Sequence, residues 1–307
     1  MISYPKDTIE FHDMFSSEKA CVEHLIQLRW PKGFVCPRCH GIRAWKKSST
    51  LFRCASCLRD VSVTSGTLFH KSHLSLRLWF QILWDVMSQK HGASALGISH
   101  ALGFSSHKTI AEALQKLRHA MVRPGRECLS GLVEVDEIIV GGLRPGSPGR
   151  SRNSKVLVLV AVEDKGRSGF GRIRLSIISD ASARSLEHAL RGMIEPRCSV
   201  HTDGWLGYQR LQSLGYDHHV IKQKETEPGV DTTPLVHRIS ALLKRWLLST
   251  HQGSVRPVHL QQYLNEFTFR FNRRTARSRG LLFHRLLSIA LIIKPQPMRS
   301  SARRSPP

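Results

Sequence analysis

The clearest shortage in this 307-residue sequence is of acidic side chains. Aspartate and glutamate number 23 against 46 lysines and arginines, which leaves a formal net charge of +23 at pH 7. A positive excess of this size repels itself unless a polyanion neutralises it. Nucleic acid is the leading candidate, although an anionic membrane surface or a merely soluble basic protein would also account for the charge. The composition therefore favours a nucleic-acid partner.

Long apolar runs are also missing. The longest clean run, residues 156–162, has the length of a strand and falls far short of the ~20 residues that span a bilayer. Residues 281–293 are interrupted by His284 and Arg285. The first residues, MISYPKDTIEF, carry charges and lack the apolar segment of a secretory signal. These absences predict a cytoplasmic, nucleoid-associated protein with no membrane partner.

Cysteines are few, and their number does not suit a framework of disulfides. Of seven, four form two CxxC pairs separated by fourteen residues, which leaves room for one strand out and one back: Cys36, Cys39, Cys54 and Cys57. Four thiolates at this spacing can surround zinc tetrahedrally, so we predict a structural zinc ribbon. Two unrelated pairs, or a redox CxxC, are the alternatives. The isolated Cys21, Cys128 and Cys198 are expected to be small buried side chains.

Basic residues surround the predicted ribbon, and they are suited to contact phosphate. They are Arg38, Arg43, Lys46, Lys47, Arg53 and Arg59. For any one of them, a solvated surface position is an equally good interpretation.

A helix-turn-helix pattern follows the ribbon. Residues 94–103 predict a short helix that ends at Gly103, and a second helix runs to residue 117 with Ser105 or Ser106 as its cap. The N-terminal end of that second helix would present DNA-binding side chains to base edges: Ser106, His107, Lys108 and Thr109. A helical hairpin within a bundle would have the same pattern.

Beyond residue 126 the pattern changes to alternating strands and helices. Strands are predicted at 132–140, 156–162, 173–178 and 200–202, and helices at 17–30, 74–90, 182–193, immediately after Asp203, 235–248 and 258–273. Asp136 lies near the end of the first strand and Asp203 directly after the last one. Two carboxylates on adjacent strands can bridge divalent metal ions such as Mg²⁺ or Mn²⁺. Either aspartate could instead cap a helix or turn.

At this point the sequence resembles a known family, the insertion-sequence transposases of the DDE type with an N-terminal zinc ribbon (the IS fifteen-ninety-five group). The resemblance covers residues 15–274. It is carried by RWPKGFVCPRC, FRCASC, SGTLFHKSHLSLRLWF, VEVDEIIVGG, HTDGWLGY, VHRISALLKRWL and HLQQYLNEFTFRFNRR. The resemblance implies an α/β catalytic domain of RNase H-like type, with a mixed sheet and flanking helices.

The resemblance also implies the site residues. Asp136 and Asp203 match the first and second catalytic acids, and His237, seven positions before Lys244, matches the third metal ligand of a DDHK-type site. Because imidazole is softer than carboxylate, His237 would favour Mn²⁺ over Mg²⁺. Lys244 and Arg245 would bind DNA phosphate. His237 could otherwise be an ordinary helix residue satisfied by a backbone partner.

Neighbouring positions are less clearly assigned. Alternation is expected to place Glu134 and Glu137 on the face opposite Asp136, or at the strand end. Leu242 stands where the closest subgroup commonly has asparagine, and Ser249 where glycine is expected. The last matched helix ends in Asn272, Arg273 and Arg274, which are either DNA contacts or packing residues.

Together these features predict a transposase that binds double-stranded terminal inverted repeats and target DNA as a homodimer or larger synaptic complex. Two metal ions held by Asp136, Asp203 and His237 would support strand cleavage and strand transfer. The rivals are an inactive DNA-binding regulator, which Leu242 and Ser249 favour, and a junction nuclease of the same fold. The predicted boundaries are a helical lead at 1–33, the zinc ribbon at 34–63, the helix-turn-helix segment at 64–125, the catalytic domain at 126–290 and a basic disordered tail at 291–307.

Overall fold

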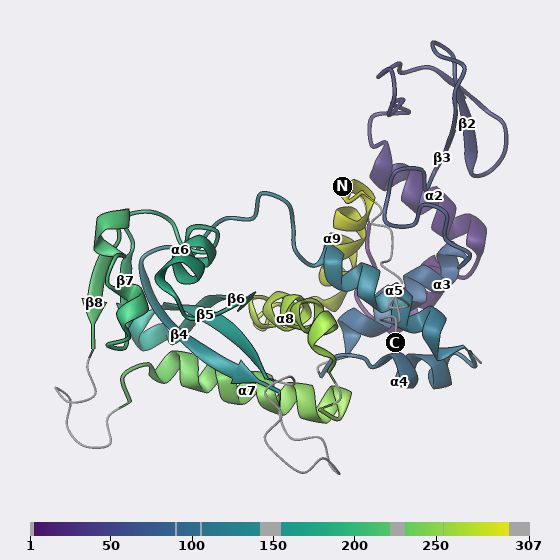
Figure 1. Cartoon of the computed structure of the whole chain (residues 1–307). Helices are drawn as coiled ribbons and strands as arrows, with labels where there is room; N and C mark the ends of the chain where they lie inside the picture. Colours follow the sequence, from purple (N-terminus) through teal and green to yellow (C-terminus); the bar gives the residue numbers. More distant parts are fainter. Residues whose placement is uncertain are drawn as a thin grey trace, which may run out of the picture. The chain divides into compact units, whose positions relative to one another are not determined.

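The computed structural model describes residues 3–89, 91–104, 106–141, 155–221, 231–253 and 255–294, which form two compact units (Figure 1). The first unit contains the chain up to residue 121 together with residues from 276 onward, and the second covers 122–275. Most of the predicted basic loop at 144–155 and of the tail at 291–307 lies outside the described residues. No described helix combines the length and apolar character needed to cross a membrane.

A five-stranded mixed sheet forms the centre of the second unit. Its strands are β4 (Leu132–Val140), β5 (Val156–Asp164), β6 (Phe170–Ile178), β7 (Ser199–Thr202) and β8 (Asp217–Val220). The order across the sheet is β6-β5-β4-β7-β8. The first three strands pair antiparallel, whereas β7 runs parallel to β4 and β8 parallel to β7. The short strand β7 therefore runs beside the first half of β4 and ends next to the middle of that strand.

Helices cover both faces of this sheet (Figure 1). The alternation of β4 sends Val133 and Val135 into the cluster with α6 (Ala183–Arg191), while Ile138 and Val140 pack in the cluster with α7 (Pro234–His251) and α8 (Pro257–Phe271). Each face buries apolar side chains, which is the main source of stability for such layers. This mixed sheet with flanking helices confirms the predicted α/β architecture of the catalytic domain.

The end of α8 packs against the edge strand β6. The Asn272 side chain accepts from the Ile173 N–H at 2.7 Å and donates to the Ile173 carbonyl at 3.1 Å. Arg273 lies over the Phe269 ring, 3.9 Å from its centroid, and Arg274 donates to the Gly171 carbonyl. Asn272 thus satisfies backbone groups that an edge strand leaves unpaired. The structure therefore gives these three residues packing roles.

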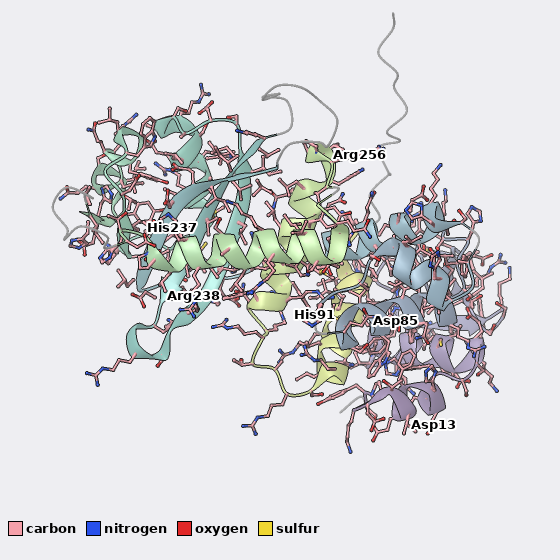
Figure 2. All side chains as sticks on the ribbon, turned by 90° about the horizontal axis from the view of Figure 1, so that it is seen from below. Asp13, Asp85, His91, His237, Arg238 and Arg256 are labelled. Carbon is pink, nitrogen blue, oxygen red and sulfur yellow. The ribbon has the colours of Figure 1, made fainter. Side chains whose placement is uncertain are left out.

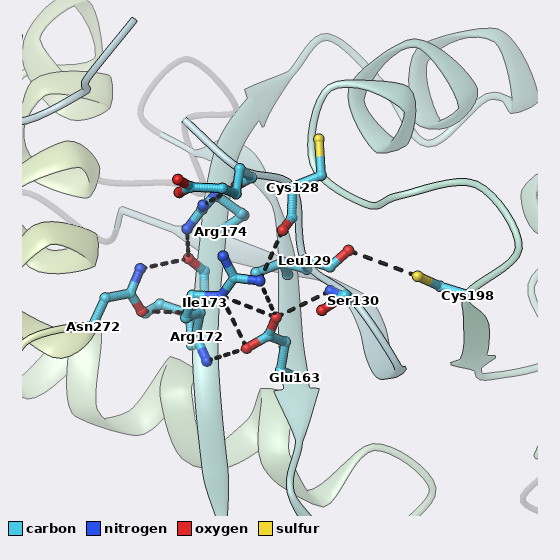
Figure 3. Close-up of polar contacts among 10 residues, drawn as sticks. Cys128, Leu129, Ser130, Glu163, Arg172, Ile173, Arg174, Cys198 and Asn272 are labelled. Atoms are coloured by element: carbon cyan, nitrogen blue, oxygen red, sulfur yellow. Dashed lines mark hydrogen bonds and ion pairs between the residues drawn. The ribbon is translucent and has the colours of Figure 1, made fainter. Parts of the chain in front are cut away.

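A buried ion pair links β5, β6 and the segment before β4 (Figure 3). The Glu163 carboxylate accepts from the Ser130 N–H at 3.0 Å and from the Arg172 N–H at 2.8 Å. The Arg172 guanidinium also donates to it, with a shortest distance of 2.6 Å, and to the Cys128 carbonyl. These contacts fully occupy a carboxylate that is only 2% exposed, as a buried charge requires.

The chain after Asp203 differs from the prediction. Instead of a helix, it forms two short 3-10 turns, Leu206–Tyr208 and Gln212–Leu214, followed by β8. Gly215 adopts φ +87°, which breaks a helix, and a Cβ at Gly207 would lie 2.6 Å from the Ala181 carbonyl. The predicted helix was wrong because Gly207 packs closely against Ala181 and Leu186, and Gly215 makes a left-handed turn.

The helices of the first unit are α1 (Thr8–Met14), α2 (Glu18–Arg29), α3 (Leu76–Ser88), α4 (Ala95–Ala101), α5 (His107–Ala120) and α9 (Arg279–Ile292). Their shared core is aromatic: the Phe283 ring of α9 contacts Phe11, Phe80 and Trp84. Helix α9 thus belongs to this unit, and the predicted end of the catalytic domain at residue 290 needs correction to about 275. The spacing of apolar residues predicts that α9 has a buried face, but not which of the two units it packs against.

Helices α4 and α5 lie where the helix-turn-helix pattern predicts them. Gly103 adopts φ +65° in the connection, and Ile110, Leu114 and Leu117 are buried as expected. Ser106, His107 and Lys108 are exposed at the N-terminal end of α5. The contact of these residues and Thr109 with DNA remains a prediction.

Candidate active site

The four cysteines of the ribbon converge on one point. Their sulfur atoms all lie within 4.8 Å of one another, with Cys36 Sγ 3.7 Å from Cys57 Sγ and Cys39 Sγ 3.5 Å from Cys54 Sγ. Tetrahedral zinc with Zn–S bonds of about 2.3 Å separates its sulfurs by roughly 3.8 Å. The four thiolates therefore fit zinc without rearrangement, in agreement with the prediction.

Two matching turns position these cysteines. His40 and Leu58, each directly after the second cysteine of its CxxC pair, have φ angles of 59° and 58°. In each CxxC turn, this residue in the left-handed conformation reverses the chain. The chain then continues into the small sheet of β1 (Ala44–Lys46), β2 (Leu51–Cys54) and β3 (Asp60–Ser62). The apolar core beneath is small: Trp30, Cys36, Cys54 and Val61 are its buried members. Such a core needs the metal for much of its stability.

The basic residues around the ribbon are not equivalent. Asp60 accepts from Arg53 Nε at 2.7 Å and from Lys47 Nζ at 3.0 Å, so part of their charge is already neutralised. Arg38, Arg43, Lys46 and Arg59 have no ion pair among the described contacts. The second group is therefore better suited to phosphate.

The two candidate catalytic acids lie near the middle of the five-stranded sheet, Asp136 at the centre of β4 and Asp203 directly after β7, which corrects the expectation that Asp136 is near the end of its strand. The parallel register pairs Glu134 of β4 with His201 of β7, so that Asp136 and Asp203 follow two residues later on adjacent strands. Asp136 Oδ1 accepts from the Glu137 N–H at 2.7 Å, and Asp203 Oδ1 accepts from the Trp205 N–H at 3.0 Å. The fold thus brings the two predicted acids side by side.

The third candidate ligand, His237, lies near the start of α7 (Figure 2). His237 Nε2 lies 3.6 Å from Asp136 Oδ2, and the His237 side chain is 55% exposed. Thr233, the residue before α7, donates its hydroxyl to the same Asp136 oxygen at 2.8 Å. The opposite imidazole nitrogen, Nδ1, lies 2.7 Å from Asp231 Oδ2. His237 thus faces Asp136 with one nitrogen and a second carboxylate with the other.

Glu134 lies on the same face as Asp136, which corrects the expectation that it faces away. Its carboxylate, 8% exposed, accepts from the Val236 N–H at 2.6 Å. Residues two apart on a strand share a face, so Glu134 and Asp136 both point toward the start of α7. Glu134 satisfies a helix N–H that has no intrahelical partner, and it fixes the end of the helix that carries His237.

Glu137 occupies the opposite face of β4, as expected, next to the buried Tyr208. Burial, together with the nearby charges of Asp136 and Asp203, raises the pKa of Glu137 to about 7. Burial also raises the pKa of Asp136, the hydroxyl of Thr233 lowers it, and the charge of Asp203 raises it again. The site therefore concentrates negative charge that a bound cation would stabilise.

The donor set suits a hard or borderline divalent cation, because it combines two carboxylates with one imidazole. Among the described residues, only the ribbon cysteines form a group of three or more ligand atoms within 4.8 Å of one another. Asp136, Asp203 and His237 are thus more widely spaced than the zinc ligands. Their convergence rests on the sheet register and on the contact of 3.6 Å between Asp136 and His237.

Two turns along α7 from His237, Lys244 and Arg245 are exposed. The buried side of the helix carries Val236, Ile239 and Leu243, so the seven-residue spacing places His237 and Lys244 on one exposed face. Leu242 is half-buried against the core, and Ser249 donates only to the Trp246 carbonyl within the helix. The contacts described for Leu242 and Ser249 do not include Asp136, Asp203 or His237.

Sequence reasoning missed Asp231 and Thr233. The segment DTTP had a usable signal, because a polar residue before proline is typical of a helix start. The long-range partners of these residues, His237 and Asp136, become evident only when the helix is packed on the sheet.

Comparison with known proteins identifies two domains in the chain. Residues 16–60 match the transposase zinc-ribbon domain, and residues 128–272 match the ISXO2-like transposase domain. The chain therefore carries a transposase zinc-ribbon domain followed by an ISXO2-like transposase domain. It is similar to an uncharacterized protein in transposable element ISH50 of Halobacterium salinarum, with 25% identity over 280 residues, covering 83% of this chain and 91% of that protein.

Solved structures give only distant likenesses. The catalytic core domain of BIV integrase matches with 16% identity and a TM-score of 0.33, covering 51% of this chain and 95% of that one. The Mos1 strand transfer complex matches with 12% identity and a TM-score of 0.25, covering 69% and 77%.

Proposed function

We propose that this transposase binds the terminal inverted repeats of its own element and catalyses metal-dependent cleavage and transfer of DNA strands. The observation that carries the proposal is the arrangement of Asp203 and His237 beside Asp136 of the central strand β4, with Lys244 on the exposed face of α7. The arrangement places ligands for a divalent metal ion near a lysine that can bind phosphate. Displacement at a phosphodiester requires both kinds of group.

Each residue has a separate role in this proposal. Asp136, Asp203 and His237 hold the divalent ions, which when bound would stabilise the attacking and leaving oxygens of an in-line displacement. Lys244 and Arg245 bind the phosphates beside the reacting bond. No serine or tyrosine nucleophile is needed, because water and then the freed 3′ hydroxyl attack phosphorus directly. The imidazole ligand favours Mn²⁺ over Mg²⁺.

DNA recognition is assigned to the first unit. The exposed basic residues of the ribbon and residues 106–109 of α5 would contact the inverted repeats. Two element ends require two active sites, so a homodimer or larger synaptic complex on double-stranded DNA is expected. A protein that acts on chromosomal DNA would be found with the nucleoid.

The test is cleavage and joining of labelled DNA that carries the ends of the element, with Mn²⁺ or Mg²⁺. Asp136→Ala and His237→Ala should abolish both reactions, while Asp217→Ala, an exposed aspartate that pairs with His219 on β8, should leave them intact. Binding of the ends without cleavage in either metal would favour the inactive regulator. Cleavage without joining would favour the junction nuclease.

A further inference from the structure

A carboxylate lies directly behind the third proposed metal ligand. Asp231 Oδ2 is 2.7 Å from His237 Nδ1, and Asp231 Oδ1 accepts from the Thr233 N–H at 3.0 Å. Both oxygens are therefore engaged, one with the imidazole and one with the backbone just before α7. An aspartate that accepts from the N–H two residues later forms a local turn, which fixes its own orientation.

This contact determines which nitrogen of His237 carries the proton. An ionised carboxylate has no hydrogen to donate, so the imidazole must donate from Nδ1. In the neutral ring the lone pair then remains on Nε2, the nitrogen that lies 3.6 Å from Asp136 Oδ2. That distance is too long for a hydrogen bond and leaves the lone pair available to a cation.

The same turn is joined to the first catalytic acid. Thr233 donates two hydrogen bonds, one from its backbone N–H to Asp231 at 3.0 Å and one from its hydroxyl to Asp136 at 2.8 Å. Thr233 is fully buried, so these bonds are shielded from solvent. Asp231, Thr233 and Asp136 thus form one connected network beside the imidazole of His237.

We propose that Asp231 is a positioning residue that holds His237 in the Nδ1–H tautomer and presents Nε2 to the catalytic metal ion. The inference rests on the proposed function, in which His237 is a ligand. A carboxylate behind a histidine ligand fixes its ring and raises its basicity, and loss of such a partner commonly weakens metal binding 10–100-fold.

The test measures Mn²⁺ affinity of the full-length, zinc-loaded protein by the electron paramagnetic resonance signal of free Mn²⁺, without DNA. Asp231→Asn replaces an acceptor with an amide that can donate toward Nδ1, which favours the wrong tautomer. Asp231→Ala leaves the ring free to adopt either tautomer. We expect about 10–100-fold weaker Mn²⁺ binding in the asparagine variant and a smaller loss in the alanine variant.

The order of the two variants separates positioning from a merely structural role. If Asp231 only stabilised the turn, alanine would be the more damaging change, because it removes both hydrogen bonds while asparagine can keep the bond from Thr233. A matched control is Asp217→Asn, which alters another aspartate–histidine pair of the same unit, 2.9 Å from His219, and should bind Mn²⁺ normally.

A double variant completes the test. If Asp231 acts only through His237, adding Asp231→Asn to His237→Ala causes no further loss of Mn²⁺ affinity. A further loss would mean that Asp231 binds the metal itself or acts elsewhere, and would overturn the inference. Normal Mn²⁺ affinity in Asp231→Asn, with weakened affinity in His237→Ala, would overturn the inference alone. Normal affinity in His237→Ala, with loss in Asp136→Ala, would instead remove His237 from the proposed site.

Discussion

Glu163→Gln should destabilise the catalytic unit without touching the proposed site. The carboxylate is 2% exposed and accepts from two backbone N–H groups and the Arg172 guanidinium (Figure 3). The pKa of Glu163 is lowered overall, because the hydrogen bonds from Arg172 and Ser130 outweigh burial. Glutamine has a similar shape but no charge. Its amide NH₂ would face the N–H donors of Ser130 or Arg172 in place of an accepting oxygen.

The cost follows from the burial of the pair. Breaking a buried ion pair by removing one partner costs about 3–5 kcal/mol. Because the Arg172 side chain is 34% exposed and can turn toward water, the lower value of about 3 kcal/mol applies. For a unit of this size that loss corresponds to a Tm lower by roughly 6–12 °C.

Calorimetry of the full-length chain would measure the change. The matched control is Glu127→Gln, which breaks an exposed pair with Arg123 and should alter stability by less than about 1 kcal/mol. Acidification should have a related effect: since the folded pKa is lowered, the contribution of Glu163 is present above the unfolded pKa and is lost as pH falls below it. A Glu163→Gln shift no larger than that of the control would refute this account of the network.

Three further predictions concern zinc, DNA and pH. Cys54→Ser should remove one zinc ligand, lower the zinc content measured by atomic absorption and expose Trp30 to fluorescence quenchers; retained stoichiometric zinc would contradict the four-cysteine centre. Lys244→Gln should weaken DNA binding at every sequence and reduce the slope of log affinity against log salt by about 1, and an unchanged slope would argue against a phosphate contact. Burial, aided by the charge of His284, lowers the pKa of His24 to about 4, so the unfolded chain binds a proton first as pH falls. Stability should therefore decline between about pH 6.5 and 4, by up to about 3 kcal/mol, and urea unfolding of His24→Phe should lack that part of the decline.

Much of the fold followed from local patterns. Strand β4 spans residues 132–140 as predicted, and Ser17 caps α2 by accepting from the Ala20 N–H. The spacing of the cysteines predicted their convergence, because a CxxC pair on a tight turn requires only neighbouring residues. The position of Asp203 directly after a strand could also be predicted, since strand length and apolar character are local properties, whereas Asp136 lies at the centre of β4 and not near its end.

Other features depended on contacts between distant segments. The pairing of Asp231 with His237, the capping of α7 by Glu134 and the packing of α9 with the first unit require elements that meet only after folding. The helix predicted after Asp203 was wrong because the sequence does not show that Gly207 packs closely against Ala181 and Leu186, or that Gly215 adopts a left-handed conformation. The sequence by itself determined the chemical groups and the strands that carry them. Only the tertiary structure decided which nitrogen of His237 faces Asp136, because that choice depends on a carboxylate positioned by the turn before α7.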